Sequence, residues 1–135
     1  MPRLSKLVRQ AIRPAPQLLV LQLTCRGPRG TRILDVAMDT GATYTVIPVE
    51  AAIAIGCDPH RSVERIEIIT AGSSIYVPVV TIPALTVLGY TLKSVKAVCH
   101  DLPPRSPVSG LLGLNVLRQF NVLLAFPDHY FEISQ

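Results

Sequence analysis

The stretch VAMDTGATYTVIP, residues 36–48, decides how this chain is interpreted, because it places an acid between two apolar runs. Asp39 follows the apolar residues 36–38, and a second apolar run begins at residue 46. Thr40 and Gly41 come directly after the acid. Burying a carboxylate costs free energy unless the group is paired or hydrogen-bonded. Something must therefore compensate for Asp39, and we expect that compensation to reflect what the protein does.

The composition indicates one small domain with an unusually apolar surface. The chain has 135 residues, which suits a single domain. Charged residues make up 16% of it, against roughly 25% in an average soluble domain. The mean hydropathy is +0.40. Such a chain has too little polar residue to coat its own surface, which favours a buried subunit interface. The alternative is a monomer with an apolar surface.

The net charge of +4 belongs to the first 16 residues, which hold Arg3, Lys6, Arg9 and Arg13 and no acid. Residues 17–135 are therefore neutral overall and offer no basic footprint for nucleic acid. We divide the chain into a basic N-terminal tail, residues 1–16, and a folded domain, residues 17–135. The tail resembles a basic amphipathic helix or an organelle transit peptide, and could touch a membrane surface. We favour a flexible tail.

The chain shows no signal that would take it into or across a membrane. No run approaches the ~20 apolar residues of a membrane span, and no secretory signal is visible. The three cysteines are Cys25, Cys57 and Cys99, an odd number without C-x-x-C spacing. This pattern argues against a disulfide framework or a zinc site and favours the reducing cytoplasm.

Short apolar runs separated by turn residues predict a mainly β fold. Expected hairpins join residues 17–25 to 31–38, 63–69 to 75–82, and 121–126 to 129–134. Further strands are expected at 84–89 and 90–99, and short helices at 48–56 and near the end of 111–120. A proline-rich loop, residues 100–110, lies between them. Turn signals roughly every ten residues indicate an all-β barrel or sandwich with one or two short helices.

A second motif, GLLGLNVL at residues 110–117, changes the meaning of Asp39. Alone, Asp-Thr-Gly fits an aspartate that caps a turn, and GLLGLNVL fits a buried strand entering a helix. Together, DTGA followed by apolar-apolar-Gly-x-Asn-x-Leu resembles the retropepsin-like aspartic proteases, in particular their bacterial single-domain branch. The resemblance covers residues 17–134. It implies a closed all-β barrel subunit with one or two short helices and an active site at a twofold dimer interface.

The resemblance also implies a role for each matching residue. Asp39 would be the catalytic aspartate. Thr40, Gly41 and Ala42 would support the catalytic loop, with Thr40 bonding across the subunit boundary. The remaining roles fall to the loop that braces this site, Leu111, Leu112, Gly113 and Asn115, and to the tip of a flap over the substrate, Ala71, Gly72, Ser73 and Ser74. No metal or cofactor is implied.

Catalysis of this kind needs two carboxylates, and the chain holds one Asp-Thr-Gly. A homodimer would place Asp39 against its own mate, so that the pair shares a proton and activates a water to cut a polypeptide substrate. Retroviral relatives carry an acid and an arginine where this chain has Thr43 and Leu114. Apolar contacts would have to replace that ion pair at the interface, where residues 18–23 and 130–134 are the expected strands.

The sequence gives weaker support for any other catalytic site. Cys99 and His100 are adjacent, so on a strand they point to opposite faces and cannot pair directly. Asp35 lies four residues before Asp39, about 13 Å away at strand rise, too far to share a proton. Two further functions stay open. One is a non-catalytic peptide-binding or dimerisation module on the same fold, and the other is a β-barrel adaptor tethered by the basic tail.

Overall fold

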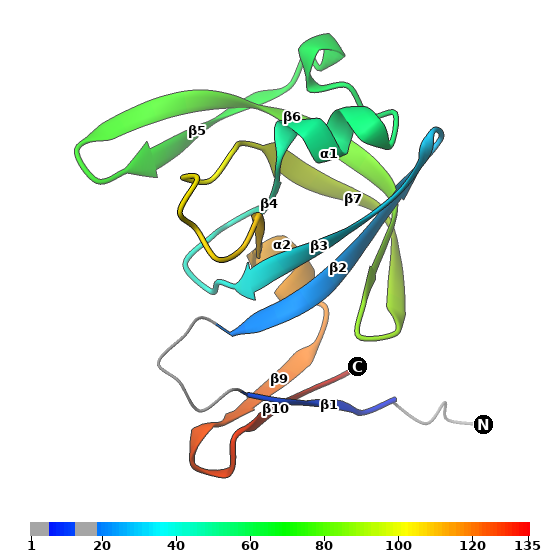
Figure 1. Ribbon diagram of the computed structural model, residues 1–135, viewed down its shortest axis with the longest axis vertical. Helices are drawn as coiled ribbons and strands as arrows, with labels where there is room; N and C mark the ends of the chain where they lie inside the picture. Colours follow the sequence, from blue (N-terminus) through cyan, green and yellow to red (C-terminus); the bar gives the residue numbers. More distant parts are fainter. Residues whose placement is uncertain (1–5, 13–18) are drawn as a thin grey trace.

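The computed structural model describes residues 6–12 and 19–135, and of Thr70 only the backbone (Figure 1). The strands in chain order are β1 Val8–Ala11, β2 Val20–Gly27, β3 Gly30–Met38, β4 Thr45–Ile47, β5 Arg65–Thr70, β6 Ser73–Val87, β7 Tyr90–Cys99, β8 Gly110–Leu112, β9 Asn121–Ala125 and β10 Tyr130–Ser134. The helices are α1 Val49–Ala54 and α2 Leu114–Leu117, with short 3-10 turns η1 Pro59–Arg61 and η2 Phe126–Asp128.

A closed barrel forms the body of the molecule. Its strands follow the order β2-β3-β8-β4-β7-β6, and β6 closes the ring by pairing with β2 along Leu23–Arg26. The predicted all-β barrel with two short helices is therefore confirmed. β5 pairs only with β6 in this sheet, so the β5–β6 hairpin projects from the barrel as a flap (Figure 1).

Alternation along the strands explains which side of the barrel is filled. On β2, Leu21, Leu23 and Cys25 are buried while Gln22 between them is exposed. This period of two is what a half-buried strand requires. The inward side chains meet those of β6 and β7 and the small residues of α1 in one continuous core.

β6 continues through a position where the sequence predicts a break. Residues 73–87 form one strand, although Pro83 separates the two runs expected at 75–82 and 84–89. Pro83 is exposed, and the β6–β7 ladder pairs Ile82 with Val95 and Ala84 with Lys93. The intervening Ser94 has a positive φ of 53° and interrupts the ladder there. A proline without an N–H is tolerated at such a point.

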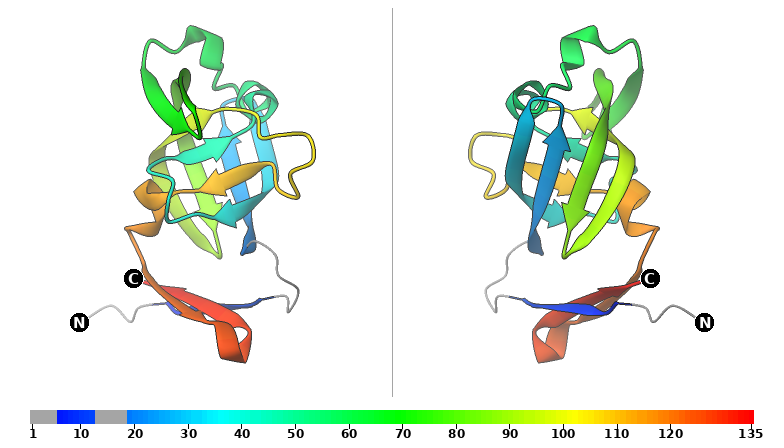
Figure 2. Two further views of the ribbon diagram at one scale, coloured as in Figure 1. Left: turned by 90° about the vertical axis from the view of Figure 1, so that its left-hand side faces the viewer. Right: turned by 90° about the vertical axis from the view of Figure 1, so that its right-hand side faces the viewer.

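A separate sheet of order β1-β10-β9 lies below the barrel (Figure 2). It contains the largest correction to the sequence analysis, because residues 8–11 of the expected tail form strand β1, neither helical nor flexible. β1 pairs with β10, and Arg9 Nε donates a 2.7 Å hydrogen bond to Glu132. The rest of the expected tail, residues 1–5 and 13–16, lies outside the described residues.

The two helices are short. Pro48 is the N-cap of α1 rather than its first residue, and Gly56, at a φ of +90°, follows its end. In the part of the chain that is described, no helix is long and apolar enough to cross a membrane.

Candidate active site

Asp39 lies at the end of β3, where the chain leaves the barrel and turns towards β4. Its amide donates to the Leu112 carbonyl of β8 at 3.0 Å. Its own carbonyl accepts from the Ala42 amide at 3.2 Å, which closes the turn around Thr40 and Gly41. The backbone on both sides of the acid is thus fixed by hydrogen bonds.

The Asp39 carboxylate is half-buried and bonded on one side only. Oδ1 accepts the Gly41 amide at 2.8 Å. A Cβ at residue 41 would lie 3.1 Å from the same oxygen, so glycine gives this amide its close approach. Oδ2 has no hydrogen-bond partner within residues 6–12 and 19–135, which leaves it available to a water or to another carboxylate.

Thr40 and Ala42 take different positions in the loop. Thr40 is exposed, and its hydroxyl bonds to no other described residue. The Ala42 carbonyl accepts the Leu114 amide at 2.8 Å, and the Thr43 carbonyl accepts the Asn115 amide at 3.1 Å. The loop after Asp39 is therefore attached to the start of α2 through backbone bonds that do not depend on the side chains of Thr43 and Leu114.

The motif at residues 110–117 braces this loop from behind. β8 pairs in parallel with β3 along Val36–Met38 and meets β4 at Val46. Where it ends, Gly113 passes so close to the segment that enters β4 that a Cβ would lie 2.5 Å from the Tyr44 carbonyl carbon. No side chain fits at that distance, so the crossing requires a glycine.

Thr45 is a structural residue of the site that the sequence analysis missed. It is the one fully buried polar side chain among the described residues. Its hydroxyl donates to Asn115 Oδ1 at 3.0 Å and accepts from the Gly113 amide at 3.1 Å, and its amide donates to Asn115 Oδ1 at 2.8 Å. Asn115 Nδ2 in turn donates to the Lys96 carbonyl at 2.7 Å. The sequence carries no local signal for this role, because threonine is an ordinary residue of a strand.

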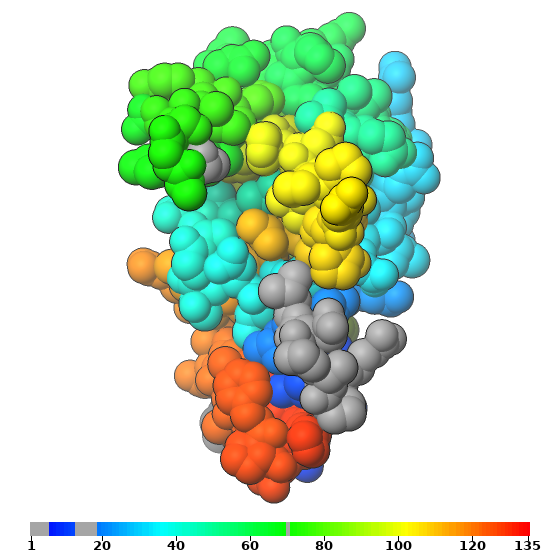
Figure 3. All heavy atoms as spheres, turned by 60° about the vertical axis from the view of Figure 1, so that its left-hand side comes forward, coloured from blue at the N-terminus to red at the C-terminus, as the bar shows by residue number. Residues whose placement is uncertain are grey.

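The flap places its tip, residues 71–74, in solvent on the same face as the loop after Asp39 (Figure 3). Gly72 has a φ of +86°, which suits the tight turn between β5 and β6. The side of the flap that faces the barrel carries Ile68 and Ile75, and both pack in the cluster that contains Tyr44 and Leu111. Apolar side chains from the flap, β8 and the loop after Asp39 thus pack against one cluster.

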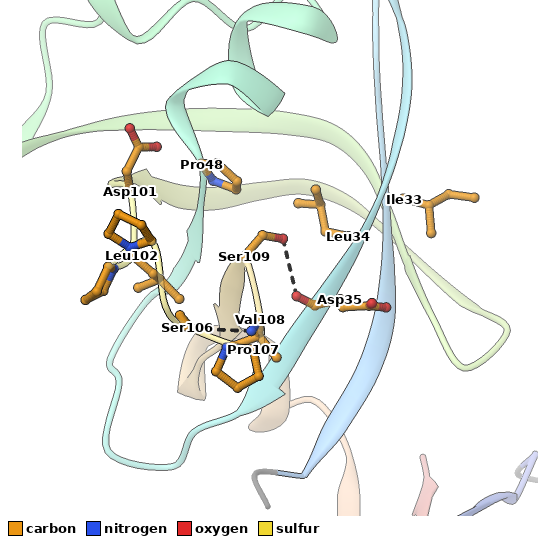
Figure 4. A pocket seen from close by; sticks show the side chains of 12 residues that line it. Ile33, Leu34, Asp35, Pro48, Asp101, Leu102, Ser106, Pro107, Val108 and Ser109 are labelled. Atoms are coloured by element: carbon orange, nitrogen blue, oxygen red, sulfur yellow. Dashed lines mark hydrogen bonds between the residues drawn. The ribbon is translucent and has the colours of Figure 1, made fainter.

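The proline-rich loop is fixed beside β3 rather than beside Asp39. Ser109 donates from its amide to the Asp35 carbonyl at 2.9 Å, and Asp101 Oδ1 accepts the Val49 amide at 3.0 Å. Between loop and strand lies a groove of about 570 Å³, with Asp35 and Asp101 towards opposite ends (Figure 4). Asp35 itself is exposed on β3 and, at the rise of a strand, lies about 13 Å from Asp39, too far to be its second carboxylate.

The other candidate groups show no catalytic arrangement. Cys99 is buried, and its burial raises the pKa of the thiol to about 12. A thiol so resistant to ionisation is a poor nucleophile. Nowhere in the described part of the chain do three His, Cys, Asp or Glu side chains form a group that could hold a metal ion.

Comparison with known proteins agrees with this site. The family model described as aspartyl protease matches residues 27–116, which include Asp39, the flap and all but the last residue of the motif at 110–117. The chain therefore belongs to the aspartyl protease family.

A solved structure shows the same fold over the whole chain. The chain is similar to a retropepsin-like aspartic protease from Rickettsia conorii, with a TM-score of 0.72 and 16% sequence identity. The match covers 99% of this chain and 96% of the other, so the fold is retropepsin-like. Among curated protein sequences, none matches this chain.

Proposed function

We propose that the protein is an aspartic endopeptidase that works as a homodimer, with the Asp39 carboxylates of two copies forming one active site. The observation that carries the proposal is the Asp39 carboxylate itself. One of its oxygens is held by the Gly41 amide and the other is unpartnered among the described residues, in a loop braced by β8 and α2. Such a group is rigidly placed and still open to a second carboxylate and a water.

Two carboxylates on a twofold axis perform complementary steps. They cannot both ionise easily, so one keeps a proton. The ionised member takes a proton from water, whose oxygen attacks the scissile carbonyl carbon, while the neutral member protonates the carbonyl oxygen. In the tetrahedral intermediate that results, a proton then passes to the amide nitrogen. The C–N bond breaks, and the products are a carboxylic acid and an amine.

The structure of the flap favours a polypeptide as the substrate. An extended peptide can add to a strand edge through its backbone, and β5 presents such an edge next to the tip. The half-buried Ile68, Ile75, Tyr44 and Leu111 would meet the side chains of that peptide near the scissile bond. We therefore expect cleavage next to apolar residues.

The test is cleavage of a mixed peptide library by the wild type, Asp39→Asn and Asp35→Asn, read by mass spectrometry from about pH 3.5 to 7. Asp35→Asn is the matched control, because it removes an exposed acid from the same strand. We expect cuts by the wild type and the control and none by Asp39→Asn, with all three proteins equally folded by circular dichroism.

Two outcomes would contradict the proposal. Equal cutting by Asp39→Asn would place the active site elsewhere. A folded, dimeric wild type that binds library peptides and cuts none at any pH would be a peptide-binding module on this fold.

A further inference from the structure

The flap strand β5 carries two opposite charges that the flap itself does not neutralise. Arg65 and Glu67 are exposed, and in the part of the chain that the structure describes neither side chain has an ion-pair or hydrogen-bond partner. Their cross-strand neighbours on β6 are uncharged, namely Pro78 opposite Arg65 and Tyr76 opposite Glu67. Both charges of β5 are therefore open to a partner from outside the flap.

The two charges lie on one side of β5, and apolar residues lie on the other. Successive side chains of a strand point to opposite faces, and burial along RIEII follows that alternation. Ile66 and Ile68 are half-buried and pack against the apolar cluster beneath the flap. Arg65 and Glu67 point away from that cluster. The strand thus presents a charged outer side and an apolar inner side.

A peptide that pairs with the free edge of β5 would meet these side chains directly. Among the described residues β5 pairs with β6 alone, so its other edge is open. Directly opposed residues of paired strands have Cβ atoms about 4.5–5.5 Å apart, and opposite charges there stabilise the pairing. Glu67 therefore favours Lys or Arg in the peptide, and Arg65 favours Asp or Glu. The two peptide residues are two positions apart, and the residue between them faces the side of Ile66.

The direction of β5 decides which charge is nearer the scissile bond. β5 runs towards the flap tip, so Glu67 is nearer the tip than Arg65. The tip extends away from the barrel on the side where the loop after Asp39 lies (Figure 1). In the proposed dimer that loop lies beside the twofold axis, where the peptide is cut. Glu67 is then closer to the cut than Arg65, and the axis gives the second flap the same order.

We propose that β5 selects peptides with a basic residue near the cut and an acidic residue two positions further out, with an apolar residue between them. Glu67 contacts the basic residue and Arg65 the acidic one. This inference rests on the proposed function and adds a substrate class to it, extended segments in which charged and apolar side chains alternate. Because one flap lies on each side of the cut, the preferred order of charges is mirrored about the scissile bond.

Peptides that differ only in the order of two charges test the proposal. All share one central pair of apolar residues, extended on one side by Lys-Leu-Asp, Asp-Leu-Lys or Gln-Leu-Gln, written outward from the cut and moved outward one residue at a time. Each kcat/KM is divided by that of the Gln peptide with the same enzyme, from about pH 5.5 to 7, where peptide carboxylates are ionised. In the register that meets β5, we expect the wild type to prefer Lys-Leu-Asp about two- to five-fold over Asp-Leu-Lys. Salt at about 1 M should remove the difference.

Exchanging the two charges of β5 should reverse this preference. The double variant Arg65→Glu/Glu67→Lys keeps the net charge of the protein and exchanges the two signs along the strand, so we expect it to cut the Asp-Leu-Lys peptide faster. Arg26→Glu is the control, because Arg26 is an exposed residue of β2, which lies in the barrel and not in the flap. It should keep the wild-type order, and circular dichroism should show all three proteins equally folded.

The possible failures are distinguishable. If the wild type cuts the peptides without regard to charge order, or if the double variant keeps the wild-type order, the inference is wrong and the protease proposal stands. If the wild type cuts none of them, the protease proposal is wrong, and peptide binding measured by fluorescence anisotropy decides the inference instead. Binding that depends on charge order and reverses in the double variant would support it, and binding without that dependence would overturn it. If Glu67→Lys lowers the oligomeric state in light scattering while charge order has no effect, the edge belongs to a second copy and the inference is overturned.

Discussion

At the scale of single residues, Thr45 links the two motifs that the sequence presents separately. Its hydroxyl joins the Gly113 amide to Asn115, and the neighbouring Leu112 carbonyl holds the Asp39 amide. Asp39 stood out because it lies between two apolar runs, and the resemblance to the retropepsin-like proteases then indicated Gly113 and Asn115. Thr45 was missed because its meaning depends on Asn115, 70 residues away. Threonine is also ordinary in a strand, so nothing local distinguishes it.

Replacing Thr45 by valine should destabilise the fold and weaken cleavage. The substitution keeps the shape but leaves the buried Gly113 amide without its acceptor, while Asn115 Oδ1 keeps only the bond from the backbone amide of residue 45. An unsatisfied buried group costs about 1–3 kcal/mol, so we expect a loss of that order in the free energy of unfolding, measured by urea denaturation.

Two variants calibrate that loss. Thr45→Ser restores the hydroxyl and should recover most of the stability. Thr86→Val removes a hydroxyl that bonds to the Thr91 hydroxyl at 2.8 Å beside solvent, and it should change stability by less than about 0.5 kcal/mol. If Thr45→Val and Thr86→Val lost the same free energy of unfolding, the buried hydrogen bonds of Thr45 would contribute no more to stability than an exposed hydrogen bond.

At the scale of elements, the sequence predicted those held by neighbours in the chain and failed where the partner is distant. The β2–β3, β5–β6 and β9–β10 hairpins were predicted because Gly, Pro and Asp mark their turns. β1 was missed because four residues gain strand character only through β10, more than a hundred positions later. The break expected at Pro83 was wrong because the irregular Ser94 opposite accommodates the proline.

The flap is the element whose conformation should matter most for activity and least for the core. Gly72→Ala puts a Cβ on a residue at a φ of +86°, which costs about 1–2 kcal/mol of backbone strain. Apart from its two chain neighbours, no described residue has an atom within 4 Å of that Cβ, so the strain is confined to the flap tip. We expect kcat/KM to fall several-fold in a peptide-cleavage assay.

Gly89→Ala is the matched control for this prediction. Gly89 has a φ of +80° in the β6–β7 turn, and its added Cβ would meet only the flexible end of Lys6. We expect both variants to lose a similar free energy of unfolding and only Gly72→Ala to lose activity. Equal activity of the two would mean that the tip does not act on the substrate.

At the scale of the whole molecule, the apolar composition and the single Asp-Thr-Gly point to the same conclusion. A charged fraction of 16% predicted a covered surface, and the structure shows an uncharged, exposed edge at β9. The sequence did not indicate that edge, because an apolar strand has the same sequence pattern whether it pairs with a strand of its own chain or with another protein. β9 lies at the edge of its sheet because β10 pairs with it on one side and β1 pairs with the far side of β10.

A shared active site predicts how the wild type responds to its own inactive variant. If subunits exchange freely, equal amounts of wild type and Asp39→Asn assort at random, and about a quarter of the dimers keep two Asp39 carboxylates. Adding an equal amount of Asp39→Asn to a fixed quantity of fully dimeric wild type should therefore halve its cleavage rate.

Assaying the same mixture at several substrate concentrations separates this effect from simple competition for substrate. A loss by competition disappears at saturating substrate, whereas a loss by subunit exchange persists as a halved maximal rate. If each chain carried a complete active site, the variant would leave the maximal rate unchanged, and Asp39 would then need a second acid from its own chain. Asp35, exposed on the same strand and turned to the groove beside the proline-rich loop, does not supply it. A halved rate would thus place the second carboxylate in the other copy.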